Sequence, residues 1–281
     1  MSDAGPTAVL PLRPLTVGEL LDSAVLLFRR QARTLLPVAI GLAASEQLLL
    51  YPLRLATGVA PPGYLPDFDN LGGYWFLLAV GAAAEVVIIA LLGNLTARAA
   101  GTLLVYPTAP LPNMLRPTGA RYGPTVAVAA LGGLLMFLAA LAMPAWIVAI
   151  ALLGGLAPAV ALERVGPLRA LGRSASLALR LGGRAAGIRV LGYLVWWILR
   201  VGLTIGVFVG LDGVGLLDPA WLVPFGAVLW AVINSIAYSV LACLDAVVHL
   251  ETRIRTEGMD IAIAQARRTG QLRPTPSAVR P

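Results

Sequence analysis

The sequence predicts an all-α integral membrane protein, a six-helix bundle with two amphipathic interfacial helices. The 281-residue chain is 58% hydrophobic and only 12% charged, whereas soluble domains carry about 25% charged residues. Its mean hydropathy is +0.83, and its apolar runs are long enough for several spans of about 20 residues. Its 21 basic residues are all arginines, and nearly all of them lie in the segments that connect the apolar runs.

The charge pattern limits the partners and the chemistry. The net charge is +7, and the arginines that produce it lie in loops beside apolar spans. This arrangement favours the lipid bilayer and its anionic lipids as partners and argues against nucleic acid. The single cysteine, Cys243, and the single histidine, His249, exclude an internal disulfide framework and a metal cluster. The sequence shows no nucleophile–base pair, metal set or phosphate-binding loop, so we expect no enzyme activity, metal or cofactor.

The chain divides into three expected parts. These are a disordered N-terminus, a six-span membrane domain and a disordered C-terminal tail, over residues 1–15, 16–261 and 262–281. The N-terminus has no basic segment followed by an apolar core, so we expect no cleavable signal peptide. Thr16 and Glu19 have the spacing of a helix capping box, which predicts an amphipathic helix over residues 16–31 at the start of the membrane domain.

Six apolar segments follow. They cover residues 34–55, 73–96, 124–142, 145–162, 186–211 and 221–247. The region 124–162 is apolar throughout and too long for one span, with Met143 and Pro144 in its middle. We therefore predict two spans joined by a tight turn; the alternative is one bent, tilted helix or a re-entrant pair.

A second amphipathic helix is predicted over residues 167–181, before the fifth span. Its apolar stripe contains Leu168, Leu171, Ala175 and Leu179. Its polar stripe contains Arg169, Arg173, Ser176 and Arg180. We expect both amphipathic helices to lie at the inner surface of the membrane.

The arginines also predict the topology. If both termini are cytoplasmic, 19 of the 21 arginines lie on the inner side, Arg54 is the only one in an outer loop, and Arg200 lies within a span. Such a bias is a strong positive-inside signal. The expected location is therefore a bacterial plasma membrane, crossed several times, with both termini in the cytoplasm.

Three stretches carry a family resemblance. They are Leu12–Ala24, Ala161–Ser174 and Leu244–Asp260. Together they resemble uncharacterised actinobacterial membrane proteins labelled "glycerophosphoryl diester phosphodiesterase membrane domain". The resemblance implies a membrane module that accompanies a phosphodiesterase domain in some relatives. That chemistry needs paired histidines and a carboxylate metal cluster, and His249 stands alone, so we do not carry the activity over.

Four polar residues fall near the middle of the predicted spans. These are Glu46, Glu85, Arg200 and Asn234. A charge at the bilayer centre costs at least about 2.5–3.5 kcal/mol, so we predict that they meet. Arg200 would bridge Glu46 or Glu85, and Asn234 would complete the hydrogen bonds. Nearer the inner side, Asp245 could pair with Arg98 or Arg189.

Two functions compete. The first is a non-catalytic scaffold or accessory subunit that contacts lipid headgroups or a protein partner through its basic cytoplasmic face. The arginines that would dock there are Arg29, Arg30, Arg33, Arg169, Arg173, Arg180 and Arg184. The alternative is a secondary transporter or lipid-handling protein that uses the midplane layer. A water-accessible cavity that reaches this layer favours the alternative, and a dry, fully paired layer favours the scaffold.

Overall fold

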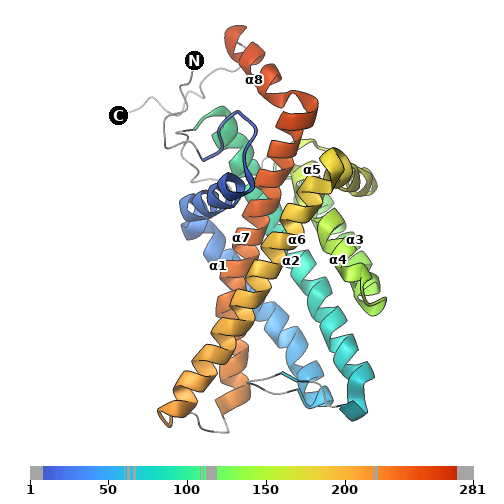
Figure 1. The fold of residues 1–281 in the computed structure, drawn as a ribbon, viewed down its shortest axis with the longest axis vertical. Helices are drawn as coiled ribbons and strands as arrows, with labels where there is room; N and C mark the ends of the chain where they lie inside the picture. Colours follow the sequence, from blue (N-terminus) through green and yellow to red (C-terminus); the bar gives the residue numbers. More distant parts are fainter. Residues whose placement is uncertain are drawn as a thin grey trace.

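The structure is a computed structural model that describes residues 9–59, 61, 64–65, 68–107, 109, 111, 119–216, 218 and 221–270. All the regular structure in these ranges is helical, as the sequence predicts. The elements in Figure 1 are α1 (Val17–Thr57), η1 (Phe68–Asn70), α2 (Leu71–Val105), α3 (Tyr122–Leu141), α4 (Ala145–Leu153), α5 (Leu156–Leu162), α6 (Pro167–Gly213), α7 (Leu222–Glu257) and α8 (Met259–Arg268). Within the described ranges, six segments are long and apolar enough to cross a membrane: α1, η1 with α2, α3, α4 with α5, α6 and α7.

The molecule has two distinct ends. The C-terminal ends of α1 and α6 and the N-terminal ends of α2 and α7 lie together at the lower end of Figure 1, which we call the loop end. Residues 9–16 and α8 lie at the opposite end, which we call the terminal end. The 36 residues of α7 would extend about 54 Å as a straight helix. It is therefore longer than a hydrocarbon core of about 30 Å.

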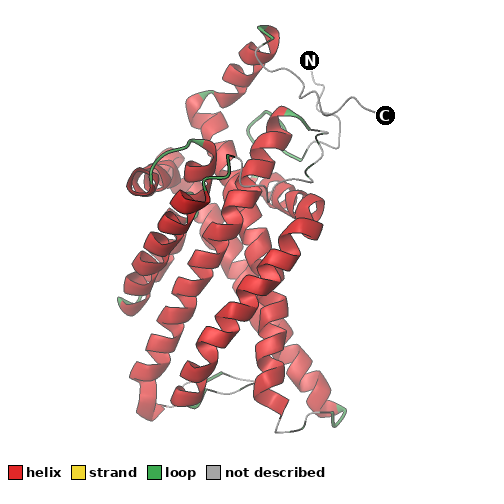
Figure 2. Ribbon diagram, turned by 180° about the vertical axis from the view of Figure 1, so that it is seen from behind, coloured by secondary structure: helices red, strands yellow, loops and turns green. Residues whose placement is uncertain are grey.

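The region 124–162 forms two segments, as predicted. Residues 142–144 turn the chain between α3 and α4. Met143 adopts a left-handed backbone conformation with φ of 57°, and Pro144, which has no backbone N–H, cannot continue the hydrogen bonding of α3. The resulting hairpin ends well short of the loop end in both views (Figures 1 and 2).

α7 is the centre of the bundle. It packs against α1, α2 and α6, and it is the most buried of the six apolar segments, whereas α6 is the least buried. The backbones of α2 and α6 hardly approach each other. Towards the terminal end, α5 packs against both of them and fills the space between them.

α6 contains the predicted change from amphipathic helix to span. Its backbone leaves the helical conformation from Arg180 to Gly183. The buried face of the preceding segment is made by Ala170, Ser174, Leu177 and Ala178. Within the predicted apolar stripe, Leu168 is 77% exposed and Leu179 is 63% exposed, whereas Leu171 packs against a buried cluster. This segment therefore packs on the protein through one face and leaves Leu168 and Leu179 exposed on another.

The domain ends differ from the sequence-based expectation. Val9, Leu10 and Leu15 are buried in the main hydrophobic core, so residues 9–15 are packed and the expected disorder does not apply to them. α8 likewise extends to Arg268, inside the expected tail 262–281. The predicted capping box is present, since Thr16 and Glu19 exchange both of its hydrogen bonds. α1 then continues without a break through Pro37, so the helix at 16–31 and the first span are one element.

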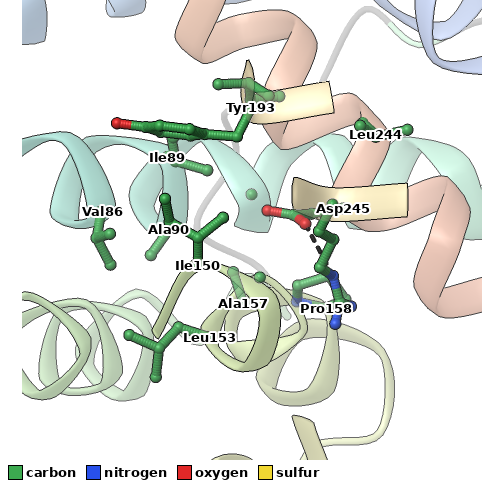
Figure 3. A pocket seen from close by; sticks show the side chains of 14 residues that line it. Val86, Ile89, Ala90, Ile150, Leu153, Ala157, Pro158, Tyr193, Leu244 and Asp245 are labelled. Carbon is green, nitrogen blue, oxygen red and sulfur yellow. Dashed lines mark hydrogen bonds and ion pairs between the residues drawn. The ribbon is translucent and has the colours of Figure 1, made fainter. Parts of the chain in front are cut away.

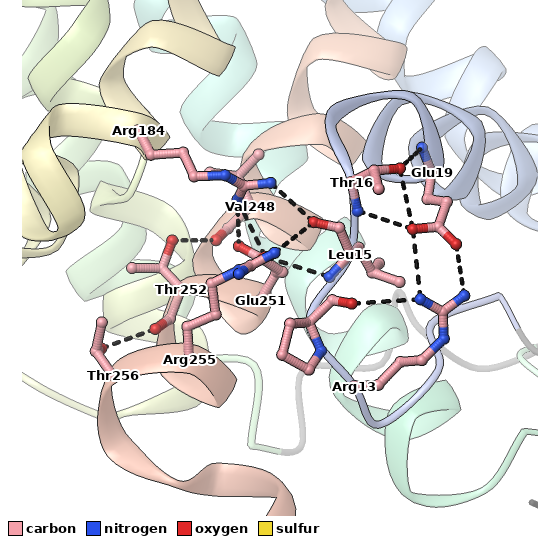
Figure 4. A network of polar contacts seen from close by, with 11 residues as sticks. Arg13, Leu15, Thr16, Glu19, Arg184, Val248, Glu251, Thr252, Arg255 and Thr256 are labelled. Carbon is pink, nitrogen blue, oxygen red and sulfur yellow. Dashed lines mark hydrogen bonds and ion pairs between the residues drawn. The ribbon is translucent and has the colours of Figure 1, made fainter.

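A buried glutamate explains why the N-terminal segment is packed. Glu251 of α7 accepts hydrogen bonds from Arg184 and Arg255 and from the backbone N–H of Leu15 (Figure 4). Both arginines also donate to the carbonyl oxygen of Leu15, at 2.8 and 2.6 Å. The start of α1 is thereby tied to α6 and α7 at the terminal end.

Candidate functional site

A cavity of about 560 Å³ lies among α1, α2, α6 and α7 in the half of the molecule nearer the loop end. Its walls are rich in large aromatic side chains: Tyr64, Tyr74, Trp75, Trp146, Tyr193, Trp197, Trp230 and Tyr238. The chain has only six tryptophans and seven tyrosines, so most of them gather here. The volume falls within the range of about 300–1,000 Å³ that is typical of ligand pockets.

The cavity follows from the helix arrangement. α2 and α6 both pack on α7 but stay apart from each other. α5 fills the space between them towards the terminal end, and the hairpin of α3 and α4 stops before the loop end. Ala140 and Trp146, at the two sides of the hairpin turn, line the edge of the cavity. The uncovered part of the space between α2 and α6 is the cavity.

All four residues of the predicted midplane layer line this cavity. Arg200 forms an ion pair of 3.0 Å with Glu85, so the structure selects Glu85 from the two predicted partners. The hydroxyl of Tyr193 donates a hydrogen bond of 3.1 Å to the same carboxylate. The Arg200 guanidinium also lies over the rings of Tyr193 and Tyr238, at 5.6 and 5.5 Å, where cation–π attraction stabilises its charge.

Glu46 belongs to a second, adjacent group. Its carboxylate accepts hydrogen bonds from the Tyr238 hydroxyl at 2.8 Å and from Asn234 Nδ2 at 3.2 Å. The side-chain amide of Gln47 donates a longer one, at 3.4 Å. Asn234 therefore completes the hydrogen bonding of Glu46, and the Tyr238 ring connects this group to Arg200.

Several polar atoms that line the cavity, among them the Tyr64 hydroxyl and Trp230 Nε1, are buried without a hydrogen-bond partner in the described structure. Within the described part of the chain, Arg200 Nε and Asn234 Oδ1 have no hydrogen-bond partner. Arg200 is 3% exposed and Asn234 is 4% exposed. A buried polar atom without a partner costs about 1–3 kcal/mol. A bound ligand or water that supplies one acceptor and one donor would satisfy both atoms.

Arg54 is a cavity residue that the sequence analysis missed. It was assigned to an outer loop, but it lies in the last turn of α1 and lines the cavity. Its Nη1 donates to Gln47 Oε1 at 2.7 Å, and its guanidinium lies 5.3 Å from the centre of the Tyr64 ring. Among the residues that the structure describes, no carboxylate forms an ion pair with it.

Tyr193 and Tyr238 were also missed, although a signal for both was present. Tyr238 follows Asn234 by four residues, and Tyr193 precedes Arg200 by seven, so each lies on the same helix face as a residue of the layer. An aromatic hydroxyl one or two turns from a buried charge is a natural hydrogen-bond partner for it.

Several of the arginines expected at the docking surface are engaged within the protein. Arg173 pairs with Glu163 and with Glu257, both at 2.6 Å. Arg180 pairs with Glu257 at 3.0 Å, and Arg184 with Glu251 at 3.1 Å. Arg30 donates to the carbonyl oxygen of Pro107 at 2.8 Å. The remaining three side chains of the set, all of them exposed, are Arg29, Arg33 and Arg169.

Comparisons with models of protein families, with characterised proteins and with solved structures find no match for this chain. The family resemblance of its three sequence stretches therefore stays a prediction.

Proposed function

We propose that this chain is a multi-pass membrane protein that binds an amphipathic ligand with an anionic headgroup in the cavity between α2 and α6. One observation carries the proposal: the cavity reaches the Glu85–Arg200 pair. A cavity at this layer is the feature expected of a lipid-handling protein or secondary transporter, whereas a packed, dry layer is expected of a scaffold.

The walls favour a ligand with a large apolar part. Aromatic side chains of α2, α4 and α6 surround the opening, among them Trp75, Trp146 and Trp197. Such side chains offer apolar area together with a polar edge, which suits a molecule that is half in hydrocarbon and half in water. Because none of the described helices covers this part of the space between α2 and α6, the ligand enters sideways from the bilayer.

The polar groups favour an anionic headgroup. Arg54 brings a partly buried cation to the cavity without an ion-pair partner among the described residues. The buried Nε of Arg200 is a hydrogen-bond donor without a partner among the described residues. Guanidinium groups bind phosphate and carboxylate through paired hydrogen bonds. The headgroup is therefore placed near Arg54, with the polar layer beneath it.

The orientation follows from the charges. The cavity lies on the loop-end side, where Arg54 is the only arginine of the outer segments. The terminal end carries most of the others, and positive charge marks the cytoplasmic side. In this orientation both termini are cytoplasmic, the membrane is a bacterial plasma membrane, and the ligand comes from its outer half.

The proposal is tested by native mass spectrometry of the purified protein with equal amounts of phosphatidylglycerol and phosphatidylcholine. The wild type is expected to retain phosphatidylglycerol several-fold more than phosphatidylcholine. Arg54→Gln is expected to lose this preference, because it removes the headgroup cation. Ala82→Phe, which fills the cavity, is expected to lose retention of both lipids.

Arg268→Gln is the matched control, because it removes an exposed arginine at the far end of the molecule. It should retain lipid as the wild type does. If Ala82→Phe retains both lipids as the wild type does, and Arg54→Gln still prefers phosphatidylglycerol, the lipid binds elsewhere. That result would overturn the proposal.

A second candidate function, docking at the terminal end, is favoured by the exposed face of the first part of α6. Leu168 and Leu179 are exposed there beside Arg169, which suits a membrane surface or a partner helix. A photo-crosslinking amino acid at Leu168 distinguishes the two. Adducts with lipid support membrane contact, and a single protein adduct supports a partner.

A further inference from the structure

A second, smaller cavity lies next to the first, nearer the terminal end. Its volume is about 50 Å³, and it lies among α2, α4, α5, α6 and α7. Tyr193 lines both cavities. In Figure 3 the Tyr193 ring lies above Ala90, and the carboxylate of Asp245 lies to the right of Ala90. The two cavities are therefore neighbours along α7 that share one side chain.

The far side of the small cavity is closed by an ion pair. Arg189 Nε lies 3.1 Å from Asp245 Oδ1, which selects Arg189 from the two partners considered for Asp245. Nη1 of Arg189 donates to the carbonyl oxygen of Ala151 at 3.3 Å. That oxygen belongs to the last turn of α4, where backbone acceptors lack intrahelical partners.

The break between α4 and α5 is shaped around this pair. A Cβ at Gly154 would overlap the Asp245 carboxylate, and one at Gly155 would lie 2.7 Å from Ser174 Oγ and 3.1 Å from Arg189 Nη2. Only glycine lets the chain pass so close to the ion pair. α4, α5 and the Arg189–Asp245 ion pair thus pack together as one unit. This unit covers the space between α2 and α6 on the side of the terminal end.

Polar groups continue beyond the pair to the terminal end. His249 lies one turn after Asp245 on α7, is fully buried, and has Nε2 2.8 Å from Glu163 Oε1. Together with Asn234 and Tyr238 these residues form a polar stripe on one face of α7. The stripe runs beneath the large cavity and beneath the small one, and it ends at the buried His249.

We propose that the two cavities are the two halves of one translocation path, along which the polar headgroup of the bound ligand crosses between α2 and α6. The inference rests on the proposed function of the large cavity. The Tyr193 ring divides the path, and the Arg189–Asp245 pair, covered by α4 and α5, closes its inner half. The inner half is closed in this structure, because about 50 Å³ holds only a few water molecules.

The test measures which thiols a small, membrane-impermeant reagent reaches. Cys243 is replaced by alanine, and single cysteines are placed at Ala82 in the large cavity and Ala90 in the small one. Silver ion, close to water in size, is added to the outside of intact cells. The protein is then denatured and treated with a maleimide. Thiols that have reacted with silver ion are those that the maleimide no longer labels.

The cysteine at Ala82 is expected to react in every background. The cysteine at Ala90 is expected to react several-fold faster in Tyr193→Ala than with Tyr193 present, because removal of the ring joins the cavities. Tyr193→Phe is the control, since it keeps the ring and removes only the hydroxyl bonded to Glu85. In that variant Ala90→Cys should stay protected.

A second variant opens the path from the cytoplasmic side. It tests the same inference if Tyr193→Ala fails to fold. Asp245→Asn weakens the closing pair, and silver ion added to inverted vesicles is then expected to reach the cysteine at Ala90.

The outcomes separate the two proposals. If Ala82→Cys reacts while Ala90→Cys stays protected in Tyr193→Ala and Asp245→Asn, the cavity is open but there is no path, which overturns this inference alone. If Ala90→Cys reacts equally in all backgrounds, the Tyr193 ring does not separate the two cavities. That result also overturns this inference. Protection of Ala82→Cys everywhere would overturn the proposed function and this inference with it.

Discussion

Arg200 of α6 and Glu85 of α2 form an ion pair of 3.0 Å across a space in which their two helices hardly approach each other. The pair therefore joins the two walls of the large cavity through side chains. Tyr193 strengthens the link, because its hydroxyl bonds to the same carboxylate. A contact of this kind holds the walls in register and leaves open space beside it.

Breaking this pair should destabilise the protein strongly. Arg200→Met leaves the buried Glu85 carboxylate without its cation, and loss of one partner of a buried pair costs about 3–5 kcal/mol. Glu85→Leu in the same chain should recover much of this, because no isolated charge remains. The free energy of unfolding, measured by circular dichroism in mixed detergent micelles, checks both. Arg169→Gln, at an exposed arginine, is the control, and equal stability of the single and double variants would contradict the argument.

Gly154 should be intolerant of even one methyl group. In Gly154→Ala the new Cβ would overlap the carboxylate of Asp245 and press on the side chain of Arg189, and overpacking typically costs about 1–3 kcal/mol. We expect a lower midpoint of thermal unfolding. Gly187→Ala on α6 is the matched control, because nothing lies within 4 Å of a Cβ there. The same midpoint for both variants would mean that α4 and α5 shift freely around the ion pair.

Glu163 should make stability depend on pH. Burial raises the pKa of its carboxyl, but the hydrogen bond with His249 and the contacts with Arg173 and Arg253 outweigh burial, so the pKa lies below its ordinary value. A carboxyl with a lowered pKa stabilises the fold fully above its unfolded pKa of about 4.3. This contribution is lost as the pH falls through the lower folded value.

Thermal unfolding measured between about pH 6 and pH 3 checks this, since the window spans the ordinary carboxyl pKa. The groups that face Glu163 are Arg173 of α6 and His249 and Arg253 of α7. Glu163→Gln should be less stable than the wild type near pH 6. The difference in thermal stability between the two proteins should shrink as the pH falls towards about 3. A difference that stays constant with pH would show that the charge of Glu163 does not matter.

The N-terminal segment should be released when Glu251 loses its charge. Glu251→Gln weakens the contacts with Arg184 and Arg255, which also hold the carbonyl oxygen of Leu15 (Figure 4). We expect faster hydrogen exchange in the peptide that contains Leu15 and unchanged exchange in the middle of α7. Asp260→Asn on α8 is the control for loss of one acidic group. Unchanged exchange at Leu15 would mean that the buried apolar residues Val9 and Leu10 suffice to hold the segment.

The polar layer shows where a sequence-based argument ends. The depth of each residue follows from its distance along a helix, so Glu46, Glu85, Arg200 and Asn234 could be placed at one level. Which glutamate contacts Arg200 depends on the rotation of α1, α2 and α6 about their axes and on the angles at which they cross. The position of a residue along its helix contains no information about either. The exposure of Leu168 and the packing of Leu171 likewise depend on how the helix is turned against its neighbours. A stripe of leucines looks alike whether it faces protein or lipid.

The sequence by itself determined the features that depend on local chemistry. Six apolar segments, the turn at Met143 and Pro144, the capping box of Thr16 and Glu19 and the break near Gly182 all follow from residue types and their spacing. Only the tertiary structure decided that α2 and α6 stand apart, that Arg54 and Tyr193 border a cavity, and that Asp245 pairs with Arg189. These contacts join residues far apart in the chain, and their geometry is decided by how whole helices pack.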